Sequence, residues 1–332
     1  MPIFPTRYSL LSAPALNQHV QDCYGFKNTT CRLLIHNVSD TYLLESPNAR
    51  YIFKIYRDAH RKKEEINGEV ELLNILHDDG ASVSHPLPDK EGRYLQAFQA
   101  AEGVRYGVLF TYADGEVYPT MSDEQLLAVG NGMACIHNLT AGLHLVHHRH
   151  PLDMEALVDT PLRVIQPAFD NGLEAEYQYL HDTATRVKQQ LLAFELPTFS
   201  HGYCHYDFLP KNFHFNAIGK VTFFDFDFSG EGYLTNDLAS FYAHFFLDVL
   251  HKKMTQQKAD RQFAVFVKGY RQQRPLSEAE SASIPYLGYL FWLFYFRFYC
   301  ENFEDWSNFF FTPRFIKERV GWMKMWDAWY LS

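Results

Sequence analysis

One short stretch of the chain gathers side chains that could bind a metal ion and move a proton. Asp207 is followed five positions later by Asn212, and Asp225 and Asp227 come soon afterwards, each with Phe on both sides. Carboxylates in such apolar company are costly unless they bind cations or polar partners. Carboxylate and amide oxygens suit Mg²⁺, and a further carboxylate could orient a hydroxyl and accept its proton. Together these are the groups that phosphoryl transfer needs.

The same residues resemble the catalytic loop and metal-binding aspartate of the aminoglycoside phosphotransferase and choline kinase family, distant relatives of protein kinases. The family pattern is His-Gly-Asp, four residues, Asn, a short hairpin and an Asp between apolar residues. In this chain the pattern is matched by His205, Tyr206, Asp207, Asn212 and Asp225. The usual glycine is replaced by Tyr206, a departure from the pattern. A second register, beginning at His201, would place Tyr203 at the Asp position and is rejected.

The resemblance implies a role for each matched residue. Asp207 corresponds to the catalytic base, and Asn212 and Asp225 correspond to the ligands of Mg²⁺. Asp227 either assists the metal or is a hydrogen-bonded residue of the hairpin, and both interpretations stay open. Lys211 either faces the transferred phosphate or is an exposed lysine of the loop.

Two further residues are expected to hold the catalytic loop in shape. His205 is interpreted as a structural residue that acts through hydrogen bonds rather than as a catalyst. Asp237 resembles the downstream aspartate that braces the loop in this family.

The elements around these residues change character along the chain. Strand-like runs at 29–35, 41–44, 51–56, 94–98 and 105–112 surround one amphipathic helix at 62–77. After Gly115 the pattern is mostly helical. With the resemblance, this predicts an α+β, protein-kinase-like two-lobed fold. Residues 1–112 would form a nucleotide-binding lobe with a small antiparallel sheet and one helix, and residues 113–332 a larger helical lobe for catalysis and acceptor binding.

The first lobe contains matches to residues that bind ATP in the family. Lys54 is the only lysine of its strand-like run and resembles the lysine that contacts the ATP phosphates. Glu69 resembles the glutamate that pairs with it; Glu71 competes but falls nearly opposite on the helix, so Glu69 is preferred. Thr111 and Ala113 lie in a stretch that resembles the hinge whose backbone holds adenine. The resemblance therefore implies ATP and Mg²⁺ as cofactors.

Bulk composition sets outer limits. The chain has 332 residues, which fits two lobes, and a formal net charge of −9, which argues against nucleic-acid binding. Its five cysteines form no CxxC pair, so neither a disulfide framework nor a zinc site is predicted and the reducing cytoplasm is the simplest location.

The first residues show no signal-peptide pattern. The most apolar stretch, 285–300, is shorter than a bilayer span and contains Arg297, which predicts a core helix and no membrane contact.

The acceptor is predicted to be a small molecule with a hydroxyl: an amino alcohol, a sugar or an aminoglycoside-like compound. Only residues 226–236 separate Asp225 from Asp237, which leaves little chain for a peptide platform, and the loop at 37–40 lacks the glycines of a protein kinase. The alternatives are a Ser/Thr protein kinase of the bacterial stress-response type and a catalytically decayed nucleotide-binding module. The decayed module is disfavoured because all the matched residues are present. The acceptor's identity and the oligomeric state stay open.

A set of aromatic residues near the end of the chain could form one wall of the acceptor site. They follow helical spacings of three and four, so they could share a face: Tyr289, Trp292, Tyr295 and Tyr299. Such a wall would suit an amine-bearing alcohol through cation–π contacts, worth roughly 0.5–2 kcal/mol per ring. The competing interpretation is that these residues belong to the core.

Overall fold

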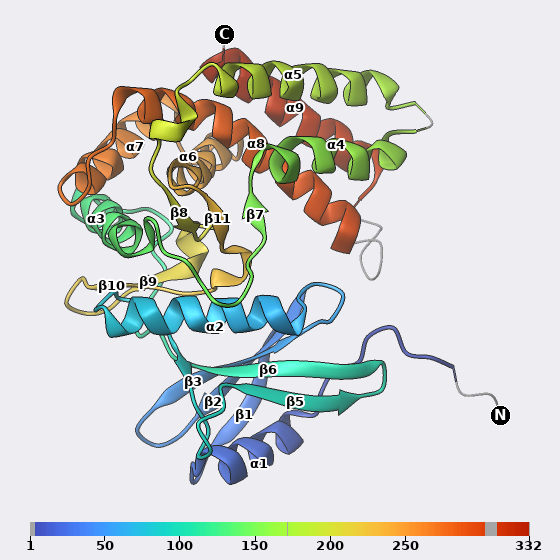
Figure 1. Ribbon diagram of the computed structural model, residues 1–332, viewed down its shortest axis with the longest axis vertical. Helices are drawn as coiled ribbons and strands as arrows, with labels where there is room; N and C mark the ends of the chain where they lie inside the picture. Colours follow the sequence, from blue (N-terminus) through green and yellow to red (C-terminus); the bar gives the residue numbers. More distant parts are fainter. Residues whose placement is uncertain (1–3, 171, 303–310, 332) are drawn as a thin grey trace. The chain divides into compact units, whose positions relative to one another are not determined.

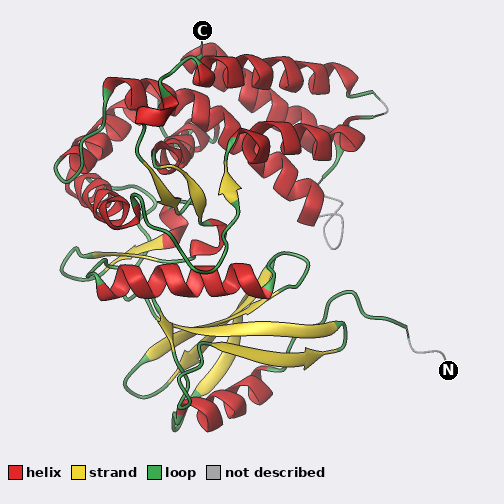
Figure 2. Ribbon diagram, viewed as in Figure 1, coloured by secondary structure: helices red, strands yellow, loops and turns green. Residues whose placement is uncertain are grey.

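The computed structural model describes residues 4–170, 172–302 and 311–331. The chain packs as two compact units. Unit 1 holds the residues up to Gly115 together with Leu145–Arg149 and Thr222–Asp227; unit 2 holds Glu116–His144, His150–Val221 and the residues from Phe228 onward. Strands dominate unit 1 and helices dominate unit 2 (Figure 2). The predicted α+β class, with an antiparallel sheet apart from a helical region, is confirmed.

Unit 1 is built on one antiparallel sheet. Its strands are β1 (Thr30–His36), β2 (Ser39–Glu45), β3 (Arg50–Tyr56), β4 (Pro86–Leu87), β5 (Leu95–Ala100) and β6 (Gly103–Thr111). The order across the sheet is β1-β2-β3-β6-β4, and β5 pairs with β6 as well. β3 lies in the middle of this order, and the residues of its second half, Phe53 to Tyr56, are all buried.

Alternation along β3 separates two faces of the sheet. Phe53 and Ile55 point to one face, where they form a core with Leu16 and Val20 of α1 (Ala13–Tyr24). Lys54 points to the other face, along which α2 (Lys63–Asp78) runs (Figure 1). A strand with a helix over each face thus carries its lysine toward α2.

The helix α2 presents a mostly apolar face to unit 1. The apolar residues at helical spacing along α2 are all buried: Ile66, Val70, Leu73 and Leu76. Glu69 is buried among them, and Gly68 leaves room for Arg149, whose side chain would lie 2.8 Å from an added Cβ. A buried acid on an otherwise apolar face needs a cationic partner. Lys54 of the sheet is such a partner for Glu69.

Unit 2 is mainly helical. Its helices are α3 (Asp123–Thr140), α4 (Thr160–Ile165), α5 (Glu174–Leu192), α6 (Thr235–Leu250), α7 (Gln256–Arg271), α8 (Glu278–Asn302) and α9 (Pro313–Tyr330). The helix α3 begins with a reciprocal capping box between Ser122 and Gln125. Among the residues that the structure describes, no helix is both long and apolar enough to cross a membrane.

Short strands complete the framework. β7 (Pro151–Leu152), β11 (Gly230–Tyr233) and β8 (His201–Cys204) form a three-stranded sheet in unit 2, which the sequence pattern did not predict because pieces this short show no alternation. β9 (Phe213–Phe215) and β10 (Val221–Phe223) lie on either side of a turn. β10 ends at Phe223, and Asp225 just beyond it adopts a left-handed φ of 63° that an extended strand does not contain.

Two glycines let α3 and α7 approach each other closely. A Cβ on Gly130 would lie 2.1 Å from the carbonyl oxygen of Phe266, and one on Gly269 would lie 2.3 Å from that of Leu127. Both obstacles are backbone atoms, which cannot move aside as a flexible side chain can. This helix pair therefore depends on having no side chain at either position.

We expect Gly130→Ala to destabilise the protein by about 1–3 kcal/mol, because the helices must separate to admit the methyl group. Urea unfolding would show this as a lower midpoint. Gly321→Ala in α9 is the matched control, since a Cβ there meets nothing within 4 Å and alanine improves helix propensity by about 1 kcal/mol. Equal midpoints for the two variants would contradict the proposed close packing.

Candidate active site

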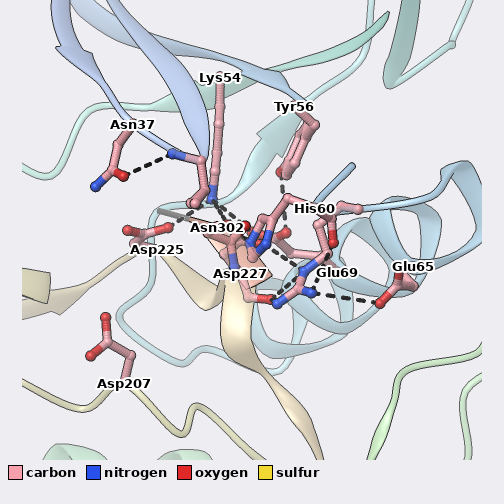
Figure 3. A network of polar contacts seen from close by, with 12 residues as sticks. Asn37, Lys54, Tyr56, His60, Glu65, Glu69, Asp207, Asp225, Asp227 and Asn302 are labelled. Atoms are coloured by element: carbon pink, nitrogen blue, oxygen red, sulfur yellow. Dashed lines mark hydrogen bonds and ion pairs between the residues drawn. The ribbon is translucent and has the colours of Figure 1, made fainter. Parts of the chain in front are cut away.

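Lys54 in unit 1 is surrounded by carboxylates (Figure 3). Its ammonium donates to Asp225 Oδ1 at 2.7 Å and lies 3.4 Å from Asp227 Oδ2 and 3.9 Å from Glu69 Oε1. Burial alone would lower the pKa of Lys54, but the three carboxylates outweigh it and hold the pKa well above its ordinary value. Lys54 is therefore a buried, permanently charged cation held by two segments far apart in the sequence.

Of the two glutamates considered for Lys54, the structure places Glu69 beside it. Glu69 also accepts a hydrogen bond from the Tyr56 hydroxyl at 3.1 Å, and burial raises its pKa. Glu71 lies on another side of α2, where it accepts the backbone N–H groups of Val146 and His147 at 2.8 and 2.9 Å. In the structure Glu69 faces the lysine, whereas Glu71 holds the loop at Val146 and His147.

Asp227 has polar partners on both carboxylate oxygens. Arg61 Nε donates to Oδ1 at 2.8 Å, and His60 Nε2 lies 3.1 Å from Oδ2. Arg61 and Arg149 also donate to the backbone carbonyl of Asp227, at 2.8 and 2.6 Å. Burial would raise the pKa of Asp227, but the surrounding cations, Lys54 foremost, hold it well below the ordinary value. These contacts favour the interpretation of Asp227 as a structural carboxylate over that of a metal ligand.

Asp225 differs from Asp227 in its exposure. Its side chain is 44% exposed, against 4% for Asp227. Its left-handed backbone turns the carboxylate out of the strand direction and toward Lys54. No group of three or more His, Cys, Asp or Glu side chains suited to a metal occurs in the described part of the chain. One accessible carboxylate fits Mg²⁺ all the same, because this ion is commonly held by one or two carboxylates plus water and phosphate oxygens.

The segment predicted to be the adenine hinge lies at the end of β6 in unit 1. Thr111 ends β6, and its backbone N–H donates to the carbonyl of His85 at 3.0 Å while its own carbonyl accepts from the Ser84 hydroxyl at 2.6 Å. The N–H of Thr111 is thus used within the unit, so an adenine contact from this residue would depend on its carbonyl. Ala113, two residues later, is buried.

Three donors in unit 2 are directed at Asp207: two come from the loop that follows it and one comes from α8. Tyr295 donates its hydroxyl to Oδ1 at 2.7 Å, and Asn212 Nδ2 and Lys211 Nζ both lie 2.8 Å from Oδ2. The Asp207 residue is only 2% exposed. Because the amide nitrogen of Asn212 serves Asp207, the amide oxygen is the group with which Asn212 could bind a cation.

Asp237, at the start of α6, holds the residues just before Asp207 in place through hydrogen bonds. It accepts the backbone N–H groups of His205 at 2.8 Å and Tyr206 at 2.6 Å, and His137 Nε2 lies 3.0 Å from the same carboxylate. These contacts hold Tyr206 at a φ of 63°, a conformation that glycine adopts at no steric cost. The tyrosine is accommodated because its ring is buried edge-on against Phe291 and Phe294. The position thus needs a left-handed residue, which explains why glycine is usual there.

Sequence reasoning missed several partners of these residues: Arg61, His60, Arg149 and His137, together with the bond from Tyr295 to Asp207. Arg61 directly precedes α2 and Arg149 lies in a basic run, so both were visible as cations. Nothing in their spacing connects them to an aspartate many residues away.

Comparison with known proteins places the chain in a family. The model of the phosphotransferase enzyme family matches residues 30–275, which include Lys54, Glu69, Asp207, Asn212 and Asp225. The chain belongs to this family. The resemblance drawn from the motif is confirmed, and the protein is an enzyme of the small-molecule kinase type that transfers a phosphoryl group to a hydroxyl.

Three proteins with sequences similar to this chain carry different names. An uncharacterized protein of Synechocystis sp. is 32% identical over 85% of this chain and 76% of its own length. The amicoumacin kinase of Bacillus subtilis is 25% identical over 79% of this chain and 77% of its own. A homoserine kinase of Rhodopseudomonas palustris is 25% identical over 81% and 77%.

Solved structures confirm the kinase-like fold of this phosphotransferase. An amicoumacin kinase in complex with AMP-PNP and Ca²⁺ superposes with a TM-score of 0.74 at 18% identity, covering 96% of this chain and 94% of the other. A microcompartment-associated aminopropanol kinase gives 0.72 at 20% identity, covering 95% of each chain. At these identities the likeness concerns the fold.

Proposed function

We propose that this phosphotransferase moves the γ-phosphate of ATP to a hydroxyl of a small molecule, with Asp207 as the base and Mg²⁺ held by Asn212 and Asp225. Unit 1 would bind the nucleotide and unit 2 the acceptor, in keeping with the predicted lobes. The observation that carries the proposal is the buried Asp207, with a cavity of about 290 Å³ in unit 2 that is lined by two of the residues bonded to it, Lys211 and Tyr295.

Each residue contributes a step that its contacts support. Asp207 would orient the acceptor hydroxyl and take its proton, and the donors around it keep the carboxylate in one orientation. Lys54, anchored by Glu69, would bind the phosphates of the nucleotide. ATP supplies the transferable phosphate and Mg²⁺ neutralises its charge.

The acceptor is small rather than a protein, for two reasons. After Asp225 the chain passes directly through a short turn (Phe226–Phe228) and β11 into α6, which begins at Thr235. This stretch leaves no length for a peptide-binding segment. The cavity beside Asp207, in turn, is the size of a small organic molecule. The proteins named for amicoumacin, homoserine and aminopropanol kinases support the same class of acceptor.

The test is a screen of acceptors with radiolabelled ATP and the purified full chain. We expect Mg²⁺-dependent label transfer to at least one small alcohol, in a panel of hydroxy acids, amino alcohols, sugars and aminoglycosides. Casein and myelin basic protein serve as protein acceptors. Robust labelling of these proteins, with none of any small alcohol, would overturn the proposal in favour of a protein kinase.

A further inference from the structure

The cavity next to Asp207 has an unusual distribution of charge. Its wall consists of apolar, aromatic and basic side chains: Leu209, Lys211, Leu247, His251, Phe291, Trp292, Tyr295, Phe296, Tyr299, Arg319 and Met323. None of the described residues that line it is acidic. Of the four aromatic residues predicted to form a wall, three line the cavity, whereas Tyr289 is fully buried in the core.

Arg319 of α9 is a cation of this wall, and within the described residues its side chain forms no ion pair. Its guanidinium lies over the ring of Trp322, 3.6 Å from the centroid, and 4.6 Å from the centroid of Phe315. Its Nε is buried and has no hydrogen-bond partner in the described part of the protein. The rings occupy the faces of the guanidinium, so the N–H edge is what remains to bind a ligand.

Arg319 and the candidate base act on the same part of the cavity. Burial raises the pKa of Tyr299, and among the smaller influences on that pKa are the charges of Arg319, Lys211 and Asp207. The Tyr299 hydroxyl therefore lies within electrostatic range of both the arginine and the base. The cavity is lined by Arg319 and also by Tyr295 and Lys211, which both contact Asp207, so a molecule in it would lie between the arginine and these partners of the base.

We propose that Arg319 binds a carboxylate of the acceptor, which makes the substrates small hydroxy acids, with or without an amine. The inference rests on the proposed function, in which Asp207 takes the proton of the acceptor hydroxyl. The planar guanidinium fork matches a carboxylate through two parallel N–H···O bonds. The same charge, with Lys211, opposes an acceptor whose only ionic group is an ammonium, in contrast to the amine-bearing alcohol predicted from the aromatic wall.

The test compares matched ligands that differ only in the proposed anchor. Glycerate, homoserine and 4-hydroxybutanoate are each paired with the neutral amide, and binding to the full chain without nucleotide is followed by ligand-observed NMR titration. For at least one pair we expect the acid to bind ten-fold or more tightly than the amide. Arg319→Gln should abolish this preference, and Arg319→Lys should retain part of it.

Arg314→Gln is the control, because Arg314 is an exposed arginine of the same helix that does not line the cavity. Thermal melting of each variant shows whether it is folded. An acid preference that is absent, or that survives in folded Arg319→Gln, overturns the inference. Transfer from ATP to uncharged or amino alcohols, independent of Arg319, would also overturn it but leave the proposed function standing. Arg319-dependent acid binding without transfer to any small alcohol would support the carboxylate site and count against the proposed function.

Discussion

Replacing Asp207 by Asn is expected to lower turnover by about 10²–10⁴ while nucleotide affinity stays nearly unchanged. The amide keeps the size of the side chain but cannot accept the proton of the acceptor hydroxyl. It also presents an N–H₂ group to a site that now holds the donors Tyr295, Asn212 and Lys211. Steady-state kinetics with the acceptor found in the screen, together with calorimetry of ATP binding, measure the two quantities separately.

Asp182→Asn is a suitable control for this variant. Asp182 is exposed on α5 and makes local contacts only, with Gln178 and His181. The same chemical change there should leave turnover unaltered. If Asp207→Asn retained near-wild-type turnover, Asp207 would be a residue that shapes the loop and another group would have to serve as base.

Asp225→Ala is expected to abolish the Mg²⁺ dependence of nucleotide binding. Of the three carboxylates around Lys54, only Asp225 is exposed enough for a metal ion to reach it, with 44% of its side chain exposed against 1% for Glu69 and 4% for Asp227. Without it, the charge of the ATP phosphates would lack its main counter-ion. Calorimetric titration with ATP, with and without Mg²⁺, should give the same weakened affinity in the variant. A Mg²⁺ dependence equal to that of the wild type would show that Asp225 only shapes the turn.

Asp227→Ala should act on stability instead. Its removal takes the nearer carboxylate away from the buried Arg61 and leaves Glu65 at 3.7 Å; breaking a buried pair costs about 3–5 kcal/mol. The pKa of Asp227 is held well below its ordinary value, so its stabilisation is complete above about pH 4, the unfolded pKa, and is lost as the pH falls through the lower folded pKa. Urea unfolding at neutral and acidic pH measures this. If nucleotide binding by the variant no longer depended on Mg²⁺ while its free energy of unfolding stayed unchanged, Asp227 would be a metal ligand and not a structural carboxylate.

Local pattern was enough to predict much of the fold and the principal residues. Alternation in the strand around Lys54 and the helical face that carries Glu69 are properties of consecutive residues. Both could therefore be derived without knowing what packs against them. The spacing from Asp207 to Asn212 is likewise local, and the structure shows the two side chains bonded to each other. The short sheet of β7, β8 and β11 escaped prediction because its strands are too short for a pattern.

Only the tertiary structure decided which charges meet. The sequence left Asp227 between two interpretations, and the structure surrounds it with Arg61, His60 and Lys54, which come from elsewhere in the chain. Tyr295 belonged to an aromatic wall by its spacing, but its bond to Asp207 joins residues 88 positions apart. The physical reason is that the sequence around a charged group or a hydroxyl does not show which residue will be its partner. Its partner is set by where the backbone brings the two groups together, out of water, and that depends on the packing of the whole unit.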